Sequence, residues 1–460
     1  MHSVDAVPQG QPRGRLFAAV RSASPGAVVL ALALPPLFLH VQYQPSVSLP
    51  LGATLKLQDL AVMAVVAAAA VAAARGELRL LRPALPLWLA TGAFLAWIVA
   101  ATFYPLLSSR SYAWSTHFVT LVGFCEYALL APAVPLVVRR RADALLVLGV
   151  LTAWTVAAAA LGVVQWAGWD IVGAWPQGRR QPSFLGQHDF TALAGMSLGA
   201  GLLGLLWRER DRRVRQAAWV AAAAGTVGFV VSGTTAGIVG LAPAVAALLY
   251  VAARRGTVST KAVVGCLAVA AVASLGVLAL RARDFDQFFR FLGVKQPQRV
   301  THTEIQTYSQ RTLLAYIGLR VWLHHPLLGV GWQGTTEQSA IAPELPAAHR
   351  RFPHVAAKAF PGPGREYGVQ MLYVQVLSDL GIVGFALLLA WIGTVLVVGM
   401  RVALYAPSGA AFAAALGTFW FVLALGLWTA LQIVAGVPLD ATTWLAVGGV
   451  AAGSSGRIRP

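Results

Sequence analysis

The sequence is 460 residues long, and 58% of its residues are hydrophobic while only 11% are charged. Soluble domains carry about 25% charged residues, so this composition excludes an ordinary soluble protein. Apolar runs of about 20 residues recur along the chain, the length that crosses a hydrocarbon core of about 30 Å. The net charge of +18 does not indicate nucleic-acid binding, because the basic residues gather between the apolar runs. We therefore predict an all-α polytopic membrane protein.

Hydropathy predicts about twelve transmembrane helices, with one large extracytoplasmic loop between helices 9 and 10. Residues 1–280 would hold transmembrane helices 1–9, residues 281–370 the loop with its amphipathic helices, and residues 371–460 transmembrane helices 10–12. The connection at 232–235 is so short that its two spans must form a tight hairpin. The expected spans are 26–43, 57–74, 84–107, 112–138, 142–166, 189–207, 216–233, 234–253, 261–280, 372–399, 410–435 and 439–453.

The distribution of basic residues predicts the orientation of these spans. If the N-terminus is cytoplasmic, most arginines lie in inner segments, including 139–141 and 208–215. The short outer connections then hold only Lys56, Arg110, Arg179 and Arg180. This asymmetry follows the positive-inside rule. It predicts a multi-pass protein of the cytoplasmic (inner) membrane, with the 281–370 loop outside.

Few polar residues are expected inside the bilayer. Glu126 is a carboxylate near mid-depth, where a charge is costly and suggests a functional role; a protonated or Arg-paired structural glutamate is an equal alternative. Cys125 and Cys266 fall within spans and are expected to be buried apolar residues rather than a disulfide. No metal-ligand spacing is present, so no metal or other cofactor is expected.

The connection before the sixth span, from Arg179 to Phe190, contains candidates for an anion site. Asp189 is placed to cap the helix that follows. Arg180 would then lie just above a helix N-terminus, where donors and dipole favour anions. Contact with lipid headgroups is the alternative for Arg179 or Arg180. For His188, as for Asp189, helix capping and a direct role are both open.

The large loop predicts a helix over 304–325 that is ended by Pro326. Arg311 and Arg320 are nine residues apart and lie on opposite faces of such a helix. We expect Arg311 to point inward, oriented by Glu304. The expected packing face consists of Ile305, Tyr308, Thr312, Ala315, Leu319 and Trp322. The histidines His302, His349 and His354 are expected to be solvated rather than catalytic.

Three features together resemble the O-antigen ligase and polymerase superfamily, which includes O-oligosaccharyltransferases. The first is the topology with one large outer loop. The second is the segment from Arg180 to Ala192, which is similar to the family's Arg…Ser/Gly-Thr-Phe-Gly-Asn-Pro-Asn segment. The third is Arg311, followed by His325-Pro326-Leu-Leu-Gly329-Val-Gly331 and by a return segment that ends in Gly381-Ile-Val-Gly384.

The resemblance implies an enzyme of the glycosyltransferase type, active in cell-envelope polysaccharide biosynthesis. Such proteins transfer or polymerise a polyprenyl-diphosphate-linked glycan at the outer face of the cytoplasmic membrane, onto a hydroxyl of a glycan, lipid or protein. Its implied partners are this donor, the acceptor and membrane lipid. Arg180 and Arg311 match the positions that handle the diphosphate. Further candidates are Gln370 and Glu366 for catalysis and Arg179, His188, Asp189, His325 and Tyr367 for substrate binding.

The sequence departs from the family pattern at the return segment, where Gln370 stands in place of a histidine. Glutamine can orient a hydroxyl but cannot accept its proton near neutral pH. His188-Asp189 also replaces the family's Pro-Asn. Three interpretations are open: another base serves (Glu366, His325 or His188), transfer proceeds by leaving-group stabilisation without a strong base, or the protein is a catalytically impaired relative that binds glycan lipids.

Two other classes compete with this interpretation. A multi-pass transporter is compatible with about twelve spans and with Glu126 as a proton site, although no internal repeat is evident. A polyprenyl-phosphate glycosyltransferase would have an acidic first outer loop. That loop, 44–56, contains no carboxylate.

Overall fold

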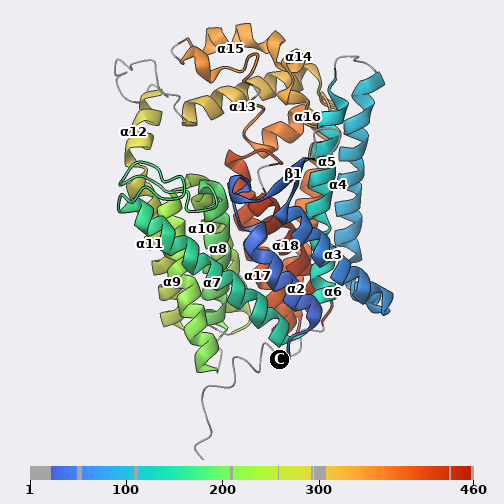
Figure 1. Cartoon of the computed structure of the whole chain (residues 1–460), viewed down its shortest axis with the longest axis vertical. Coiled ribbons are helices and arrows are strands. Elements are labelled where there is room, and N and C mark those ends of the chain that lie inside the picture. Colours follow the sequence, from blue (N-terminus) through green and yellow to red (C-terminus); the bar gives the residue numbers. More distant parts are fainter. Residues whose placement is uncertain are drawn as a thin grey trace, which may run out of the picture.

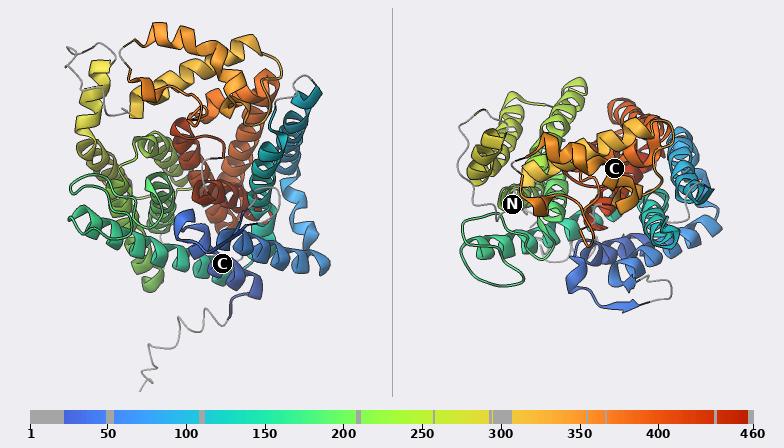
Figure 2. Two further views of the ribbon diagram at one scale, coloured as in Figure 1. Left: turned by 45° about the horizontal axis from the view of Figure 1, so that its top comes forward. Right: turned by 90° about the horizontal axis from the view of Figure 1, so that it is seen from above.

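The structure is a computed structural model that describes residues 22–48, 54–107, 112–207, 211–256, 258–291, 294, 307–353, 355–365, 367–434 and 437–456. These residues form a helical bundle with a cap of shorter helices at one end (Figure 1). Seen from above, the cap lies over the middle of the bundle (Figure 2). Several residues named in the sequence predictions lie outside the described residues: Arg110, His302, Glu304, Ile305, His354 and Glu366.

The bundle is built from long apolar helices. Their bounds are α2 Pro25–Leu37, α3 Leu57–Ala74, α4 Leu85–Phe103, α5 Trp114–Ala128, α6 Leu130–Val137, α7 Arg141–Trp166, α8 Gln187–Leu206, α9 Arg212–Ser232, α10 Thr235–Arg254, α11 Thr260–Leu280, α16 Leu372–Tyr405, α17 Ser408–Leu427 and α18 Val437–Ser454. A two-stranded antiparallel sheet, β1 Ser46–Ser48 and β2 Thr54–Lys56, lies between α2 and α3.

The cap comes from the polar segment between α11 and α16. Its α-helices are α12 Ala282–Phe291, α13 Thr307–His324, α14 Gln338–Ile341 and α15 Leu345–Arg351. Short 3₁₀ helices complete the described structure: Val41–Tyr43, Glu77–Leu80, Arg82–Ala84, Tyr104–Leu107, Gly334–Thr336, Ala342–Glu344, Ala357–Ala359 and Trp428–Ala430.

Among the described residues, ten helical segments are long and apolar enough to cross a membrane. The protein is therefore an all-α polytopic membrane protein. The first expected span corresponds to α2, which has only 13 residues, and the last corresponds to α18, which is not one of the ten. The count of twelve stays a prediction.

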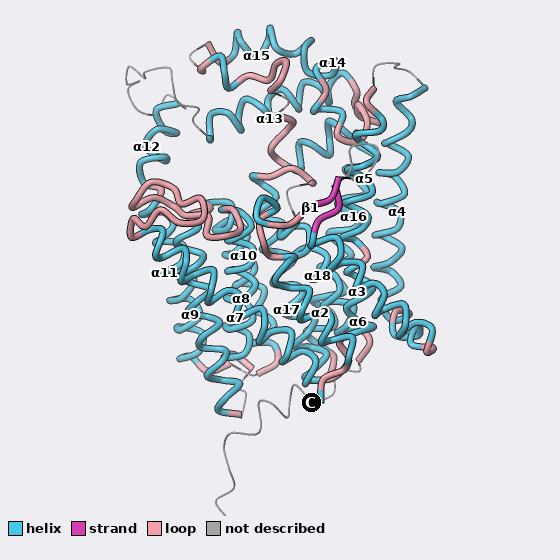
Figure 3. The backbone as a smooth tube through the Cα atoms, viewed as in Figure 1, coloured by secondary structure: helices cyan, strands magenta, loops and turns pink. Residues whose placement is uncertain are grey.

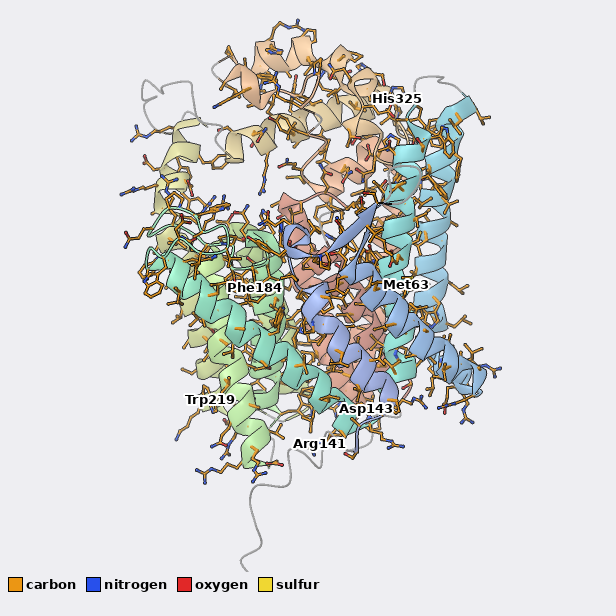
Figure 4. The ribbon with its side chains drawn as sticks, viewed as in Figure 1. Met63, Arg141, Asp143, Phe184, Trp219 and His325 are labelled. Carbon is orange, nitrogen blue, oxygen red and sulfur yellow. The ribbon has the colours of Figure 1, made fainter. Side chains whose placement is uncertain are left out.

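The charge pattern predicts that the basic connections and the large polar segment lie at opposite ends of the bundle, and they do. Figure 4 shows Arg141 and Trp219 at the end opposite the cap, whereas His325 lies in the cap. The segments 139–141 and 211–215 thus lie at one end and the segment between α11 and α16 lies at the other. The tight hairpin at 232–235 is confirmed, since α9 ends at Ser232 and α10 begins at Thr235, with Gly233 left-handed at φ 61°.

Helix α8 runs through the centre of the bundle, and small residues let its neighbours approach closely. A side-chain carbon on Gly201 would collide with the backbone nitrogen of Ala222 in α9. Similarly, one on Gly426 of α17 would collide with the backbone nitrogen of Gly240 in α10. Small residues at such crossings allow backbone-to-backbone packing in membrane bundles. This packing fixes the start of α8 at the end of the bundle that faces the cap.

The cap is joined to the bundle where α16 breaks. Gly381 leaves the helical conformation with φ 66° and ψ −170°, and the segment 325–331 docks against this break. Backbone hydrogen bonds run in both directions: Val330 N to Ser378 O (3.0 Å), Gly331 N to Asp379 O (2.8 Å), Ile382 N to Pro326 O (2.9 Å) and Val383 N to Leu327 O (3.4 Å). A broken helix frees backbone groups that must find partners within a membrane protein. The segment 325–331 supplies them.

One face of helix α13 packs within the cap, and another face is turned toward the bundle. Leu313, Ile317 and Val321 pack with Ile341 and Ala348 in a small core of the cap. On the other side, a side-chain carbon on Gly318 would meet Val369, 2.6 Å away, just before α16. The packing face expected from the sequence is wrong, because Leu319 is 40% exposed and Thr312, Ala315 and Trp322 are only partly buried.

The docking of 325–331 generates a stability prediction. Gly329→Ala drives a methyl group into the backbone of Asp379, at φ +75°. The left-handed conformation costs alanine about 1–2 kcal/mol, and overpacking adds about 1–3 kcal/mol. We expect a clearly lower unfolding temperature in detergent. Gly364→Ala is the matched control, since Gly364 is also left-handed (φ +72°) but has nothing within 4 Å. Equal shifts in the two variants would contradict the docking role.

Candidate active site

The connection between α7 and α8 is irregular but tightly held. Figure 3 shows it as a long loop at the end of the bundle that faces the cap. Buried Gln165 donates to the carbonyls of Ile171, Val172 and Ser183 and accepts from Ser183 N. Buried Gln181 accepts from Trp175 N (2.8 Å) and donates to carbonyls at 175, 176 and 179. Two amide side chains thus replace regular secondary structure here.

This loop separates the two neighbouring arginines. Arg179 is exposed, as contact with lipid headgroups or solvent requires. Arg180 turns back over the loop, with its guanidinium carbon 4.7 Å from the centre of the Trp175 ring. Its stem lies against Gly233, where a side-chain carbon would come within 2.6 Å of the Arg180 Cβ. Any larger residue at 233 would displace Arg180, so the left-handed glycine of the α9–α10 hairpin makes room for it.

Helix α8 begins two residues earlier than expected, and this changes the role of Asp189. Gly186 is the N-cap, with φ 101° and no side-chain cap bond. The prediction that Asp189 caps the helix is therefore wrong. Asp189 lies within the first turn, where a carboxylate is favoured by the helix dipole, and it accepts a hydrogen bond from the backbone of Leu439 at the start of α18. Asp440 is buried within electrostatic range of Asp189.

Arg311 meets α8 from the cap. Its Nη2 lies 3.2 Å from His188 Nε2. Because a guanidinium can only donate, Nε2 is the acceptor, and the neutral ring carries its proton on Nδ1. The Gln187 amide nitrogen also approaches Nε2, at 3.3 Å. His188 Nε2 is thus engaged by two donors rather than open to a substrate.

Arg320 lies on the face of α13 opposite to Arg311, as predicted. Its Nε donates to Glu344 Oε2 at 2.6 Å, and His324 Nδ1 lies 2.6 Å from Glu344 Oε1. Glu344 is only 2% exposed. This ion pair, which raises the pKa of Arg320 through the hydrogen bond to Glu344, holds the cap together. Arg311 takes no part in that ion pair and faces the bundle.

A third arginine, Arg281, belongs to this group and is not among the residues predicted from the sequence. Arg281 ends α11, is 6% exposed, and pairs with Asp284 at 2.8 Å. Arg311, Arg180 and Arg281 all lie close enough to act electrostatically on His188. We call these three residues the arginine cluster. No local pattern marks Arg281, because its place depends on α11 packing beside α8 and α9.

The remaining candidates lie apart from the arginine cluster or carry structural contacts. His325 is exposed; it lies 14 residues beyond Arg311, about 21 Å along the chain at helical rise. Figure 4 places it far from Phe184 in the connection before α8. The Tyr367 hydroxyl donates to Lys358 O (3.3 Å), and its carbonyl accepts from Gln432. Gln370 is half-buried beside Val369, near Gly318 of α13.

A second buried polar group joins the cap to α16. Asp379, 2% exposed, accepts from Thr335 N at 2.9 Å. Tyr112 lies beside it, and burial together with Asp379 and Glu337 raises the pKa of Tyr112. Glu337 itself bonds His117 at 2.7 Å. Within the described ranges, no three His, Cys, Asp or Glu residues come together as a metal site requires.

Comparison with known protein families finds a match for one segment of the chain. Residues 219–389 match the family model described as O-Antigen ligase, a range that includes Arg281, Arg311 and the break at Gly381. No curated protein matches the chain. The matched family suggests glycan transfer of the O-antigen ligase or polymerase type. This match supports a relationship of the segment 219–389 to the O-antigen ligase superfamily.

Proposed function

We propose that the protein transfers or polymerises a polyprenyl-diphosphate-linked glycan onto an acceptor hydroxyl at the outer face of the cytoplasmic membrane. The observation that carries the proposal is the contact between Arg311 and His188. This contact joins the cap to the first turn of α8. All three residues of the arginine cluster lie close enough to His188 to act on it electrostatically. A leaving lipid diphosphate needs such fixed positive charge.

The chemistry of the cluster suits a diphosphate. Guanidinium groups donate in a planar fork that matches phosphate oxygens, and they stay charged at all physiological pH values. Preorganised donors stabilise the charge that develops on a leaving group most strongly where water is excluded. Arg281 is nearly buried, and Arg180 and Arg311 are partly buried. The diphosphate would therefore lie between the cap and the starts of α8 and α10.

The membrane setting supports a lipid-linked donor. The arginine cluster lies at the cap-facing ends of candidate membrane spans, α8 and α11 among them. Those ends are the ones predicted to be extracytoplasmic. A polyprenyl chain anchored in the bilayer would bring its diphosphate to this level. Membrane lipid and the glycan donor are accordingly the proposed partners, with a glycan, lipid or protein as acceptor.

Removing the charge at the arginine cluster gives the first test. Purified protein in liposomes is supplied with a polyprenyl-diphosphate oligosaccharide and candidate acceptors, and transfer is measured. We expect Arg311→Ala and Arg180→Ala each to lower the rate by about 10²–10³-fold, the cost of losing one stabilising donor. Arg350→Ala, exposed on α15, is the matched control and should transfer at the normal rate. Normal transfer by both cluster variants would refute the site.

The position of Arg180 gives a second test. Gln181→Leu removes hydrogen bonds to three carbonyls and one N–H of the connection, and each buried group left without a partner costs about 1–3 kcal/mol. We expect faster proteolysis within 167–186 and weaker binding of polyprenyl diphosphate. Gln177→Leu is the control, because Gln177 is exposed and makes one bond, to Ala167 O. Unchanged proteolysis of the Gln181 variant would argue against this role.

A further inference from the structure

A site that binds a diphosphate must also release it after transfer, and an inference about that release rests on the proposed function. Arg281 differs from the other members of the arginine cluster in its burial. It is 6% exposed, whereas Arg180 and Arg311 are only partly buried. A buried charge is destabilising when it has no partner of opposite charge. Arg281 therefore needs an anion from the protein itself before the donor binds.

The end of α11 places Arg281 beside Arg180. A side-chain carbon on Gly233, in the hairpin between α9 and α10, would lie 2.6 Å from Arg180 Cβ and 3.1 Å from Leu280 Cδ2. Gly233 thus lies against both Arg180 and the residue that precedes Arg281. Both arginines also act electrostatically on His188. A group that changes the charge balance at Arg281 therefore acts on the proposed diphosphate site.

The anion that pairs with Arg281 is Asp284, in the first turn of α12. Asp284 Oδ2 lies 2.8 Å from Arg281 Nε, and the two side chains are 41% and 7% exposed. The backbone N–H groups of Asp284 and Phe285 donate to the carbonyl of Arg281, at 3.0 Å and 3.2 Å. Helix α12 therefore begins directly at the end of α11, and its first turn brings the carboxylate to the guanidinium. The ion pair joins an enclosed cation to an anion that reaches water.

This difference in exposure makes the anion the exchangeable member of the pair. An exposed carboxylate loses little when it leaves its partner, because water solvates it and screens the pair. A diphosphate offers Arg281 more negative charge and more acceptor oxygens than one carboxylate, and guanidinium groups bind phosphate oxygens in a planar fork. Two anions at one arginine would repel each other. A bound diphosphate would therefore replace Asp284 rather than lie beside it.

A second ion pair in α12 has no such link to the arginine cluster. Asp286 Oδ2 lies 2.9 Å from Arg290 Nε, and the two side chains are 37% and 32% exposed. The two residues are four apart, the spacing of ordinary ion pairs along one helix. This pair joins two residues of α12, whereas the pair of Arg281 and Asp284 joins α12 to the end of α11. Asp286 is thus a matched control for Asp284.

We propose that Asp284 is an internal counter-ion of the diphosphate site, which pairs with Arg281 before the donor binds and is displaced by the donor's diphosphate. After transfer, the polyprenyl diphosphate that remains is held by the arginine cluster, and Asp284 competes with it for Arg281. This competition lowers the affinity of the site for the product and speeds its release. Asp284 makes and breaks no covalent bond, and its role is to set the affinity for the lipid diphosphate.

Binding of the product measures this competition directly. The purified full chain in nanodiscs of uncharged phospholipid is titrated with polyprenyl diphosphate that carries no glycan. Asp284→Asn keeps the size of the side chain and removes its charge. We expect this variant to bind about tenfold more tightly, the worth of a charged hydrogen bond that water partly screens. Inhibition of transfer by added polyprenyl diphosphate should strengthen by the same factor, and Asp286→Asn should behave as the wild type does.

The direction of the change separates competition from a structural role. If Asp284 only held Arg281 and α12 in place, Asp284→Asn would disturb the site and weaken binding. A double substitution assigns the effect to Arg281, because coupled residues give non-additive changes. We expect the double variant Asp284→Asn, Arg281→Gln to bind no more tightly than Arg281→Gln alone.

The outcomes separate this inference from the proposed function. If the wild type binds polyprenyl diphosphate but Asp284→Asn binds it equally or less tightly, the counter-ion role is overturned and the arginine cluster is unaffected. Equal gains in Asp284→Asn and Asp286→Asn would also overturn it, since a general loss of negative charge would then explain both. If the wild type binds no polyprenyl diphosphate, the proposed function fails and this inference fails with it.

Discussion

The constraint on which the outer part of the structure depends is the break in α16. At Gly381 the helix gives up its own hydrogen bonds, and a membrane offers no water to satisfy the freed backbone groups. The segment 325–331 fills this need by pairing its backbone with residues 378–383. Two glycines allow the contact, since a side chain on either Gly329 or Gly381 would collide with the opposing backbone. At this break the cap is therefore joined to the bundle by main-chain hydrogen bonds, in addition to the side-chain contacts of Asp379 and Arg311.

That joint fixes the direction of α13, and the direction gives its two arginines different tasks. Nine residues of helix turn a side chain by half a circle. Arg320 binds buried Glu344 and holds the cap together, so the opposite face must look toward the bundle. Arg311 lies on that face and reaches His188. The cap thus contributes one charged group to a site whose other parts belong to α8, α11 and the connection after α7.

Whether a feature of the fold or site could be predicted from the sequence depends on how far apart in the chain its contacting residues lie. Apolar runs, the 232–235 hairpin and the opposed arginines are local patterns, and all are present in the structure. The start of α8 was misplaced because Gly186, rather than a capping side chain, begins it. Arg281 could not be found locally, because its place depends on α11 packing beside α8 and α9. No sequence pattern identifies Gln165 and Gln181, because their roles depend on the conformation of the loop whose backbone groups they bind.

The first turn of α8 brings these constraints together. Two of its polar residues, His188 and Asp189, replace the Pro-Asn of the family pattern, and they make contacts on different sides of the helix. His188 accepts a hydrogen bond from Arg311 of the cap. Asp189 lies near His40 and accepts a hydrogen bond from the backbone of Leu439 at the start of α18. The residues that depart from the family pattern at 188–189 thus tie the start of α8 both to the cap and to α18.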